Sequence, residues 1–118
     1  MKYTLIIFTM FFLALGHAQQ NSISKPLYAS IEMKYLNQNS PVQLQYLAHP
    51  FGGSGQYEYR WRTKDGQFEE FGNEKIYNVS FDCSTNDTPE CTVHLQVRDK
   101  KTFKIYDVEY VHIVDFCN

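Results

Sequence analysis

The sequence predicts an all-β protein, an antiparallel Greek-key β-sandwich of about seven short strands. Two observations lead to this fold class. After residue 18 no segment keeps a helical period, and apolar residues instead alternate with polar ones over short runs. Gly, Pro, Asn and Asp interrupt these runs at the intervals of about 8–12 residues that are typical of sandwich domains.

Each predicted strand is a run of this alternation. The expected strands are 28–36, 42–46, 57–62, 75–83, 91–99 and a β-rich segment 103–116, with a short edge strand or loop at 67–74. In the last segment the alternation changes phase between Ile105 and Val108, which predicts a bulge or two short strands.

The stretch 52–66 joins a glycine-rich turn to an aromatic strand and an Asp-Gly turn. Glycines accept the positive φ values that a tight turn needs. Three aromatic residues, Tyr57, Tyr59 and Trp61, then alternate with Glu58, Arg60 and Arg62. We expect the aromatic side chains to face the core and the charged ones to face solvent.

The strand 91–99 has the same pattern, with Val93, Leu95 and Val97 expected to face inward. If it pairs with 57–62, the outward residues of both strands form one polar face. Those residues are Glu58, Arg60, Arg62, Thr92, His94, Gln96 and Arg98.

The N-terminal residues have the pattern of a secretory signal peptide: Lys2, an apolar run, and small residues before an expected cleavage site after Ala18. We therefore expect a signal peptide at 1–18, an N-terminal extension at 19–26 and a single domain at 27–118. The apolar run is shorter than the roughly 20 residues of a membrane span. We therefore expect the protein to be secreted, periplasmic or at the cell surface, and not to be inserted in a membrane once the signal peptide is removed.

Export makes disulfides the expected use of cysteine. Cys83 and Cys91 bracket a polar, turn-rich loop, so we expect them to form a bridge. Cys117 has no obvious partner; it could pair with either of these, link two chains, or stay free. Asn78 and Asn86 begin glycosylation sequons, whose use depends on the source of the protein.

The composition argues against several functions. The formal net charge is only −2, without the clustered basic face that nucleic-acid binding requires. No spacing indicates a catalytic triad, a metal site or a phosphate-binding loop, and no cofactor is expected. His94 and His112 could approach each other if they lie on neighbouring strands, but a solvated face is the preferred interpretation. We therefore expect a protein that is not an enzyme.

The motifs "GGSGQYEYRW" and "CTVHLQVRD" resemble the PKD-type immunoglobulin-like domain, and are especially similar to the adhesin repeats of gliding Bacteroidetes. The matched residues are Gly52, Gly53, Tyr57, Tyr59, Trp61, Thr92, Val93, Leu95, Val97 and Asp99. The resemblance implies an immunoglobulin-like sandwich that serves as a non-catalytic adhesive or interaction module. Cys91 replaces a tyrosine of the family pattern, which is consistent with a disulfide in place of that packing.

A binding role follows for a module of this kind. We expect contact with an exported protein or a glycan through loop residues Phe51, Phe68 and Phe71 and through Arg60 and Arg62. The alternative for the three phenylalanines is that each folds back and caps the core. A second possible function is a small exported inhibitor or immunity-type protein that acts through the loop between Cys83 and Cys91.

Overall fold

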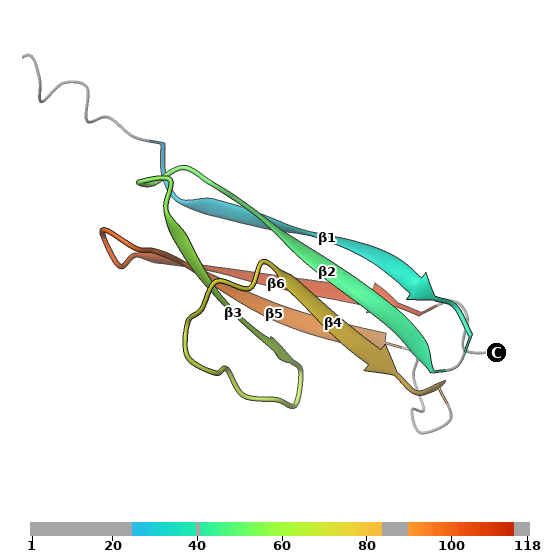
Figure 1. Ribbon diagram of the computed structural model, residues 1–118. Helices are drawn as coiled ribbons and strands as arrows, with labels where there is room; N and C mark the ends of the chain where they lie inside the picture. The colour runs from blue at the N-terminus through green and yellow to red at the C-terminus, as the bar shows by residue number, and fades with distance from the viewer. Residues whose placement is uncertain (1–24, 40, 84–89, 115–118) are drawn as a thin grey trace, which may run out of the picture.

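The computed structural model describes residues 25–39, 41–83 and 90–114, and these residues form six strands. The strands are β1 (Tyr28–Asn37), β2 (Val42–Phe51), β3 (Tyr57–Thr63), β4 (Ile76–Phe81), β5 (Glu90–Asp99) and β6 (Ile105–Ile113). They make two three-stranded antiparallel sheets, which lie over one another (Figure 1). We call β1-β2-β4 sheet A and β3-β5-β6 sheet B.

The all-β prediction is confirmed, whereas the expected count of about seven strands is one too many for the part of the chain described. The segment 67–74, expected as a short edge strand or a loop, belongs to a long loop between β3 and β4. A single bridge between Tyr59 and Gly72 is its one strand-like contact. No described helix is long and apolar enough to cross a membrane.

The core lies between the inner faces of the two sheets and follows the predicted alternation. The buried apolar residues are Ala29, Val42, Leu44, Tyr46, Ala48, Tyr59, Trp61, Phe81, Cys91, Val93, Leu95, Val97 and Val114. Strands β3 and β5 pair directly, with Trp61 opposite Leu95 and Arg60 opposite Gln96. Trp61 keeps only 7% of its surface exposed, so the predicted aromatic inner face is confirmed there.

Strand β6 differs from its prediction. It pairs with β5 without interruption from Ile105 to Ile113, so the expected bulge or strand break is wrong. Apolar residues occupy both faces of this strand, which hides its period in the sequence: Tyr106, Val108 and Tyr110 pack inward, while Ile105, Val111 and Ile113 are exposed. A register irregularity instead occurs in β1, between Tyr35 and Asn37.

The glycine-rich turn is locked to the end of β5 by a buried carboxylate. Asp99 is 1% exposed and accepts hydrogen bonds from the Ser54 backbone N–H and hydroxyl, both at 2.7 Å. It also accepts the backbone N–H groups of Lys101 at 2.8 Å and Thr102 at 3.2 Å. Gly53 has φ +60°, and a Cβ there would lie 2.4 Å from the Asp99 carboxylate. The glycine is therefore needed both for its backbone conformation and for space.

These hydrogen bonds also decide the ionisation of Asp99. Burial alone would raise the pKa of its carboxyl group, but the donors from Ser54, Lys101 and Thr102 outweigh burial and hold the pKa well below its ordinary value of 3.8. Asp99 therefore stays charged and joins the β2–β3 turn to the β5–β6 turn.

The predicted Cys83–Cys91 bridge is wrong, because Cys91 is a free, buried thiol. Its side chain faces the core in phase with Val93 and Leu95, and the Tyr46 hydroxyl donates a hydrogen bond to its sulfur at 3.4 Å. Burial raises the pKa of the Cys91 thiol, although the Tyr46 hydrogen bond opposes the shift. Cys117 and the loop 84–89 lie outside the described residues.

Candidate functional site

The outer face of sheet B carries a stack of alternating arginine and phenylalanine side chains. The order is Arg62, Phe68, Arg60, Phe71, Arg98 and Phe103, and we call this set the cation–π ladder. The guanidinium carbon of Arg60 lies 5.0 Å from the Phe68 ring centroid and 4.2 Å from that of Phe71. Arg98 lies 4.2 Å from Phe71 on its other side. Such contacts are attractive because the negative face of an aromatic ring meets a cation.

The ladder brings together four of the five predicted binding residues. Phe68 and Phe71 are half-buried over arginines on the outer face of sheet B, and do not cap the core between the sheets. Phe51 lies elsewhere, exposed at the end of β2, with its ring 4.8 Å from that of Tyr28. The sequence did not indicate Phe103 as a member, because a single aromatic residue in a lysine-rich turn has no periodicity.

Polar contacts fix the arginines below the rings. Arg98 forms an ion pair with Glu58 at 2.7 Å, and the two residues lie opposite each other in the paired strands β3 and β5. The Nε group of Arg60 donates to Gln96 at 2.6 Å, and the Gln96 amide donates to Asp107 at 2.5 Å. The predicted polar face is thus present, and its cations are largely compensated by neighbouring acceptors.

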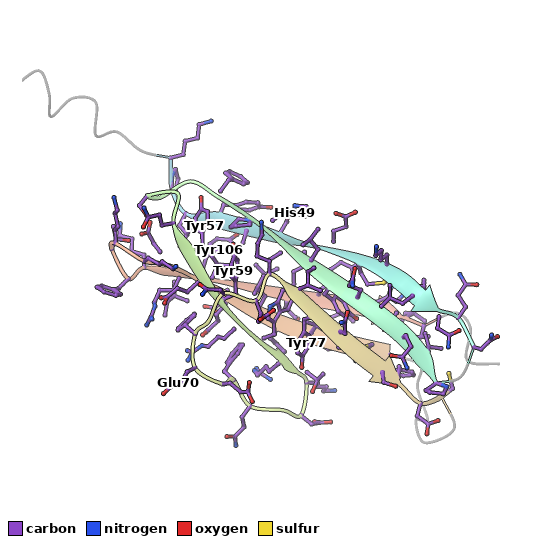
Figure 2. All side chains as sticks on the ribbon, in the orientation of Figure 1. His49, Tyr57, Tyr59, Glu70, Tyr77 and Tyr106 are labelled. Atoms are coloured by element: carbon purple, nitrogen blue, oxygen red, sulfur yellow. The ribbon has the colours of Figure 1, made fainter. Side chains whose placement is uncertain are left out.

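The β3–β4 loop is also held by backbone hydrogen bonds. Tyr59 and Gly72 exchange two of them, at 2.7 and 2.8 Å, and the Ala48 N–H donates to the carbonyl of Lys75 at 2.9 Å. The Trp61 indole donates to the carbonyl of Glu74 at 2.9 Å. The ladder on one side and these bonds on the other therefore fix the course of the loop between the two sheets. Figure 2 shows Glu70 at the outer margin of this loop.

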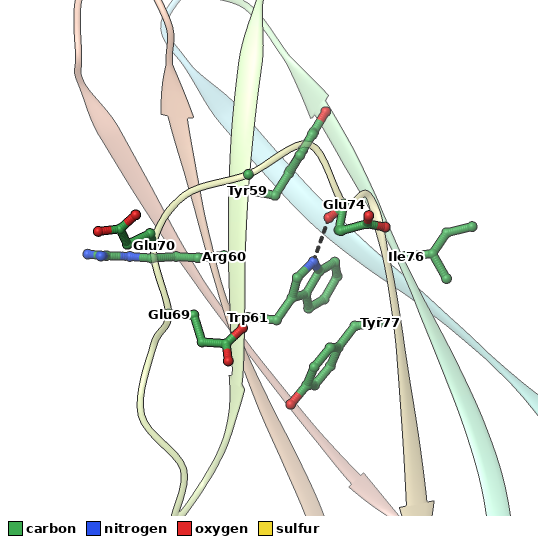
Figure 3. Close-up of a pocket in the computed structure, with 9 residues that line it drawn as sticks. Tyr59, Arg60, Trp61, Glu69, Glu70, Glu74, Ile76 and Tyr77 are labelled. Carbon is green, nitrogen blue, oxygen red and sulfur yellow. Dashed lines mark hydrogen bonds between the residues drawn. The ribbon is translucent and has the colours of Figure 1, made fainter.

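A pocket of about 180 Å³ lies between β3, β4 and the loop, with Trp61 and Tyr77 on the side of β3 opposite the Arg60 guanidinium (Figure 3). Its lining residues are Tyr59, Arg60, Trp61, Glu69, Glu70, Gly72, Glu74, Ile76 and Tyr77. The rings of Trp61 and Tyr77 stack with 5.4 Å between centroids and 10° between planes. Burial raises the pKa of the Tyr77 hydroxyl, and the nearby Glu69 carboxylate raises it further. Sequence reasoning missed this pocket, since Trp61 and Tyr77 meet across two different sheets.

The histidines do not form a joint site. His94 faces outward with its Nε2 atom 3.4 Å from Glu109, whereas His112 faces inward and contacts the Tyr35 hydroxyl at 2.5 Å. The two side chains therefore lie on opposite faces of sheet B, which contradicts the idea that they approach each other. Within the described ranges, no group of three His, Cys, Asp or Glu side chains is arranged to hold a metal ion.

The two outer faces of the sandwich differ in chemistry. Sheet A presents hydrogen-bonded polar pairs, Gln43 with Ser80 at 3.1 Å and Gln45 with Asn78 at 3.2 Å. Sheet B and its β5–β6 turn present exposed apolar side chains at the two ends of β6, with Asp107 and Glu109 between them. These are Phe103, Ile105, Val111 and Ile113, of which Phe103 is 64% exposed.

Comparisons of the chain with protein-family models, curated proteins and solved structures found no match. Two features stand out in the described part of the chain: the cation–π ladder with its apolar neighbours, and the aromatic pocket with its acidic margin.

Proposed function

We propose that the chain is an exported, non-catalytic, immunoglobulin-like module that binds a protein partner through the outer face of sheet B. The strand order supports the immunoglobulin-like part of the proposal. Constant-type immunoglobulin domains have one sheet of strands A, B, E and D and one of strands C, F and G. The orders β1-β2-β4 and β3-β5-β6 correspond to A-B-E and C-F-G, with the β3–β4 loop in the place of strand D.

The observation that carries the binding proposal is the cation–π ladder together with the exposed apolar residues at the two ends of β6. Solvent-facing strand positions are normally polar, as at the Gln43–Ser80 and Gln45–Asn78 pairs of sheet A, although Leu36, Phe51 and Ile76 are exposed on that sheet. Aromatic residues and arginine are enriched in protein interfaces, and contiguous exposed apolar surface marks interaction sites. On the edge strand β6, exposed Ile105 lies opposite Arg98 of the ladder, and exposed Val111 and Ile113 lie at the other end of the strand, beyond Asp107 and Glu109.

Phe103 adds an independent argument. It has φ +64°, a left-handed conformation that costs a non-glycine residue about 1 kcal/mol or more. The turn nevertheless holds this large, exposed side chain at the end of the ladder. Strain of this kind is common at binding sites, so Phe103 is a candidate contact residue.

The inhibitor alternative was based on a loop pinned by a Cys83–Cys91 disulfide, and Cys91 is instead a free thiol, so that pairing does not support it. The balanced charges on the outer face of sheet B also disfavour a polyanionic glycan, because Glu58, Asp107 and Glu109 lie among the cations.

Site-specific photo-crosslinking tests the proposal in cells that export the protein. A benzophenone amino acid replaces Val111 on sheet B in one variant and Lys34 on sheet A in the control; both native residues are exposed on edge strands. We expect a protein adduct from position 111 and none from position 34. No adduct at position 111, adducts of equal yield at both positions, or an adduct only with a second copy of this chain would contradict it.

A further inference from the structure

We propose that the pocket between β3, β4 and the loop receives a lysine side chain of the bound protein. Its ammonium group would lie between the aromatic rings of Trp61 and Tyr77 and the carboxylates of Glu69 and Glu74. The inference deepens the proposed function, because the partner that covers sheet B would supply the lysine. The lysine would make a second contact between the partner and this chain, separate from the outer face of sheet B.

The charge of the pocket favours a cation. Three carboxylates, from Glu69, Glu70 and Glu74, line it together with one cationic residue, Arg60. The Arg60 guanidinium is engaged between the Phe68 and Phe71 rings. Figure 3 shows it extending from β3 on the side opposite Trp61. Figure 3 also shows Glu70 beside Arg60 on that side, so Glu69 and Glu74 determine the potential next to the Trp61 and Tyr77 rings.

The aromatic lining suits the whole length of a lysine side chain. An ammonium group is attracted to the faces of tryptophan and tyrosine rings, and its aliphatic stem packs on apolar surface. Trp61 and Tyr77 cover each other's facing sides, so the part of this pair left open to a ligand is chiefly the half-buried Tyr77, and Ile76 adds an exposed aliphatic side chain at the margin. Glu69 lies close enough to raise the pKa of the Tyr77 hydroxyl, so a carboxylate and a ring converge on the same space.

The lining is fixed before any ligand arrives. The Trp61 indole bonds the backbone of Glu74, and Gly72 is paired with Tyr59. On the far side of the loop, Phe68 and Phe71 are held in the cation–π ladder, on either side of Glu69 and Glu70 in the sequence. A fixed pocket loses little conformational entropy on binding, which favours recognition of a single side chain.

The test uses the only tryptophan of the chain as the reporter. Nα-acetyl-lysine N-methylamide is titrated into the ¹⁵N-labelled mature protein, and the Trp61 indole N–H resonance is followed by NMR. Nα-acetyl-norleucine N-methylamide, which lacks the ammonium group, is the matched ligand control. Methyl glucoside tests a sugar as the alternative occupant.

We expect a saturable shift of the indole resonance with the lysine compound alone. The double variant Glu69→Gln/Glu74→Gln should weaken it about tenfold, an effect of the size expected for two lost carboxylate contacts. The control Glu32→Gln, an exposed glutamate on sheet A, should leave it unchanged.

Three results would overturn the inference: equal shifts with the norleucine compound, a shift with the glucoside alone, or no shift with any ligand. Each is distinguishable from a failure of the proposed function, because the crosslink at position 111 does not depend on the pocket. A crosslink at position 111 without an indole shift on addition of the lysine compound would support the protein-binding face and refute the lysine pocket.

Discussion

Asp99 shows how one residue can join two turns. Its carboxylate is buried and receives four donors, so its charged form is strongly favoured in the folded state. Replacing Asp99 by Asn removes the charge and places an amide N–H₂ group near backbone donors. We predict that Asp99→Asn lowers the free energy of unfolding at pH 7 by about 2 kcal/mol, measured by denaturant titration.

The same residue predicts an acid-dependent stability. Because the folded-state pKa of Asp99 is lowered, its contribution is complete above the unfolded-state pKa near 4 and is lost as the pH falls below it. The wild-type protein should therefore lose more stability between pH 5 and pH 2 than Asp99→Asn does. Asp65→Asn, at an exposed turn position, is the control and should follow the wild type. Parallel pH curves for wild type and Asp99→Asn would refute this role.

Cys91 yields a chemical prediction. Its thiol is 5% exposed, and burial raises its pKa, so little reactive thiolate is available in the folded protein. We expect Cys91 not to react with a thiol reagent at pH 8 under native conditions, and to react fully after unfolding without reductant. Peptide mapping provides the check. A disulfide-linked peptide that contains Cys83 and Cys91 would show that Cys91 is not a free, buried thiol.

At the scale of the elements, the cation–π ladder explains why a long loop without regular structure follows a defined path. Phe71 contacts Arg60 and Arg98, so Phe71→Leu removes two cation–π contacts and keeps most of the apolar volume. Each contact is worth about 0.5–1 kcal/mol near the surface. We predict that the Gly72 N–H, which bonds the Tyr59 carbonyl, then exchanges with solvent about tenfold faster.

Phe103→Leu is the matched control for this exchange measurement. Phe103 lies at the end of the ladder, 5.5 Å from Arg98, and has no contact with the loop in the ladder. The Gly72 exchange rate should stay at the wild-type value in Phe103→Leu. If both variants, or neither, change this rate, the ladder does not hold the loop.

Strands were predictable where one face is apolar and the other polar. Strand β5 is the clearest case, because Val93, Leu95 and Val97 alternate with polar residues and are fully buried. Strand β6 was less predictable. Apolar residues occur at both its odd and its even positions, so the sequence does not show which side chains face the core. Cys91 carried a signal that was overlooked: it has the parity of Val93, so it faces the core and not the neighbouring loop.

The candidate site was harder to predict than the fold. Alternation correctly placed Arg60 and Arg62 on an outer face, but it says nothing of which loop residues lie above them. Phe68 and Phe71 belong to a segment with no strand period, and the pairing of Trp61 with Tyr77 joins two sheets. Such contacts depend on tertiary packing, so neither local spacing nor composition reveals them.

At the scale of the whole molecule, the outer face of sheet A carries hydrogen-bonded polar pairs, and the outer face of sheet B carries the cation–π ladder with balanced charges and exposed apolar residues. The inner faces of both sheets are buried in the core, so a partner can bind only at the outer faces, the loops or the sheet edges. The β3–β4 loop borders both the ladder and the acidic pocket. A partner that covers sheet B would therefore also reach the pocket through this shared loop.

The most direct test of the proposed binding face is saturable binding of the fluorescently labelled protein, residues 19–118, to the cells that produce it. Val111→Ser/Ile113→Ser alters sheet B, and Glu32→Ser/Lys34→Ser alters equivalent exposed positions on the edge strand of sheet A. Because all four positions are exposed, the free energy of unfolding should change little, by about 0.5 kcal/mol per site. We predict that the sheet B variant binds about tenfold more weakly and that the sheet A variant binds like the wild type. Equal affinity of both variants, or a loss confined to the sheet A variant, would contradict the assignment of the binding face.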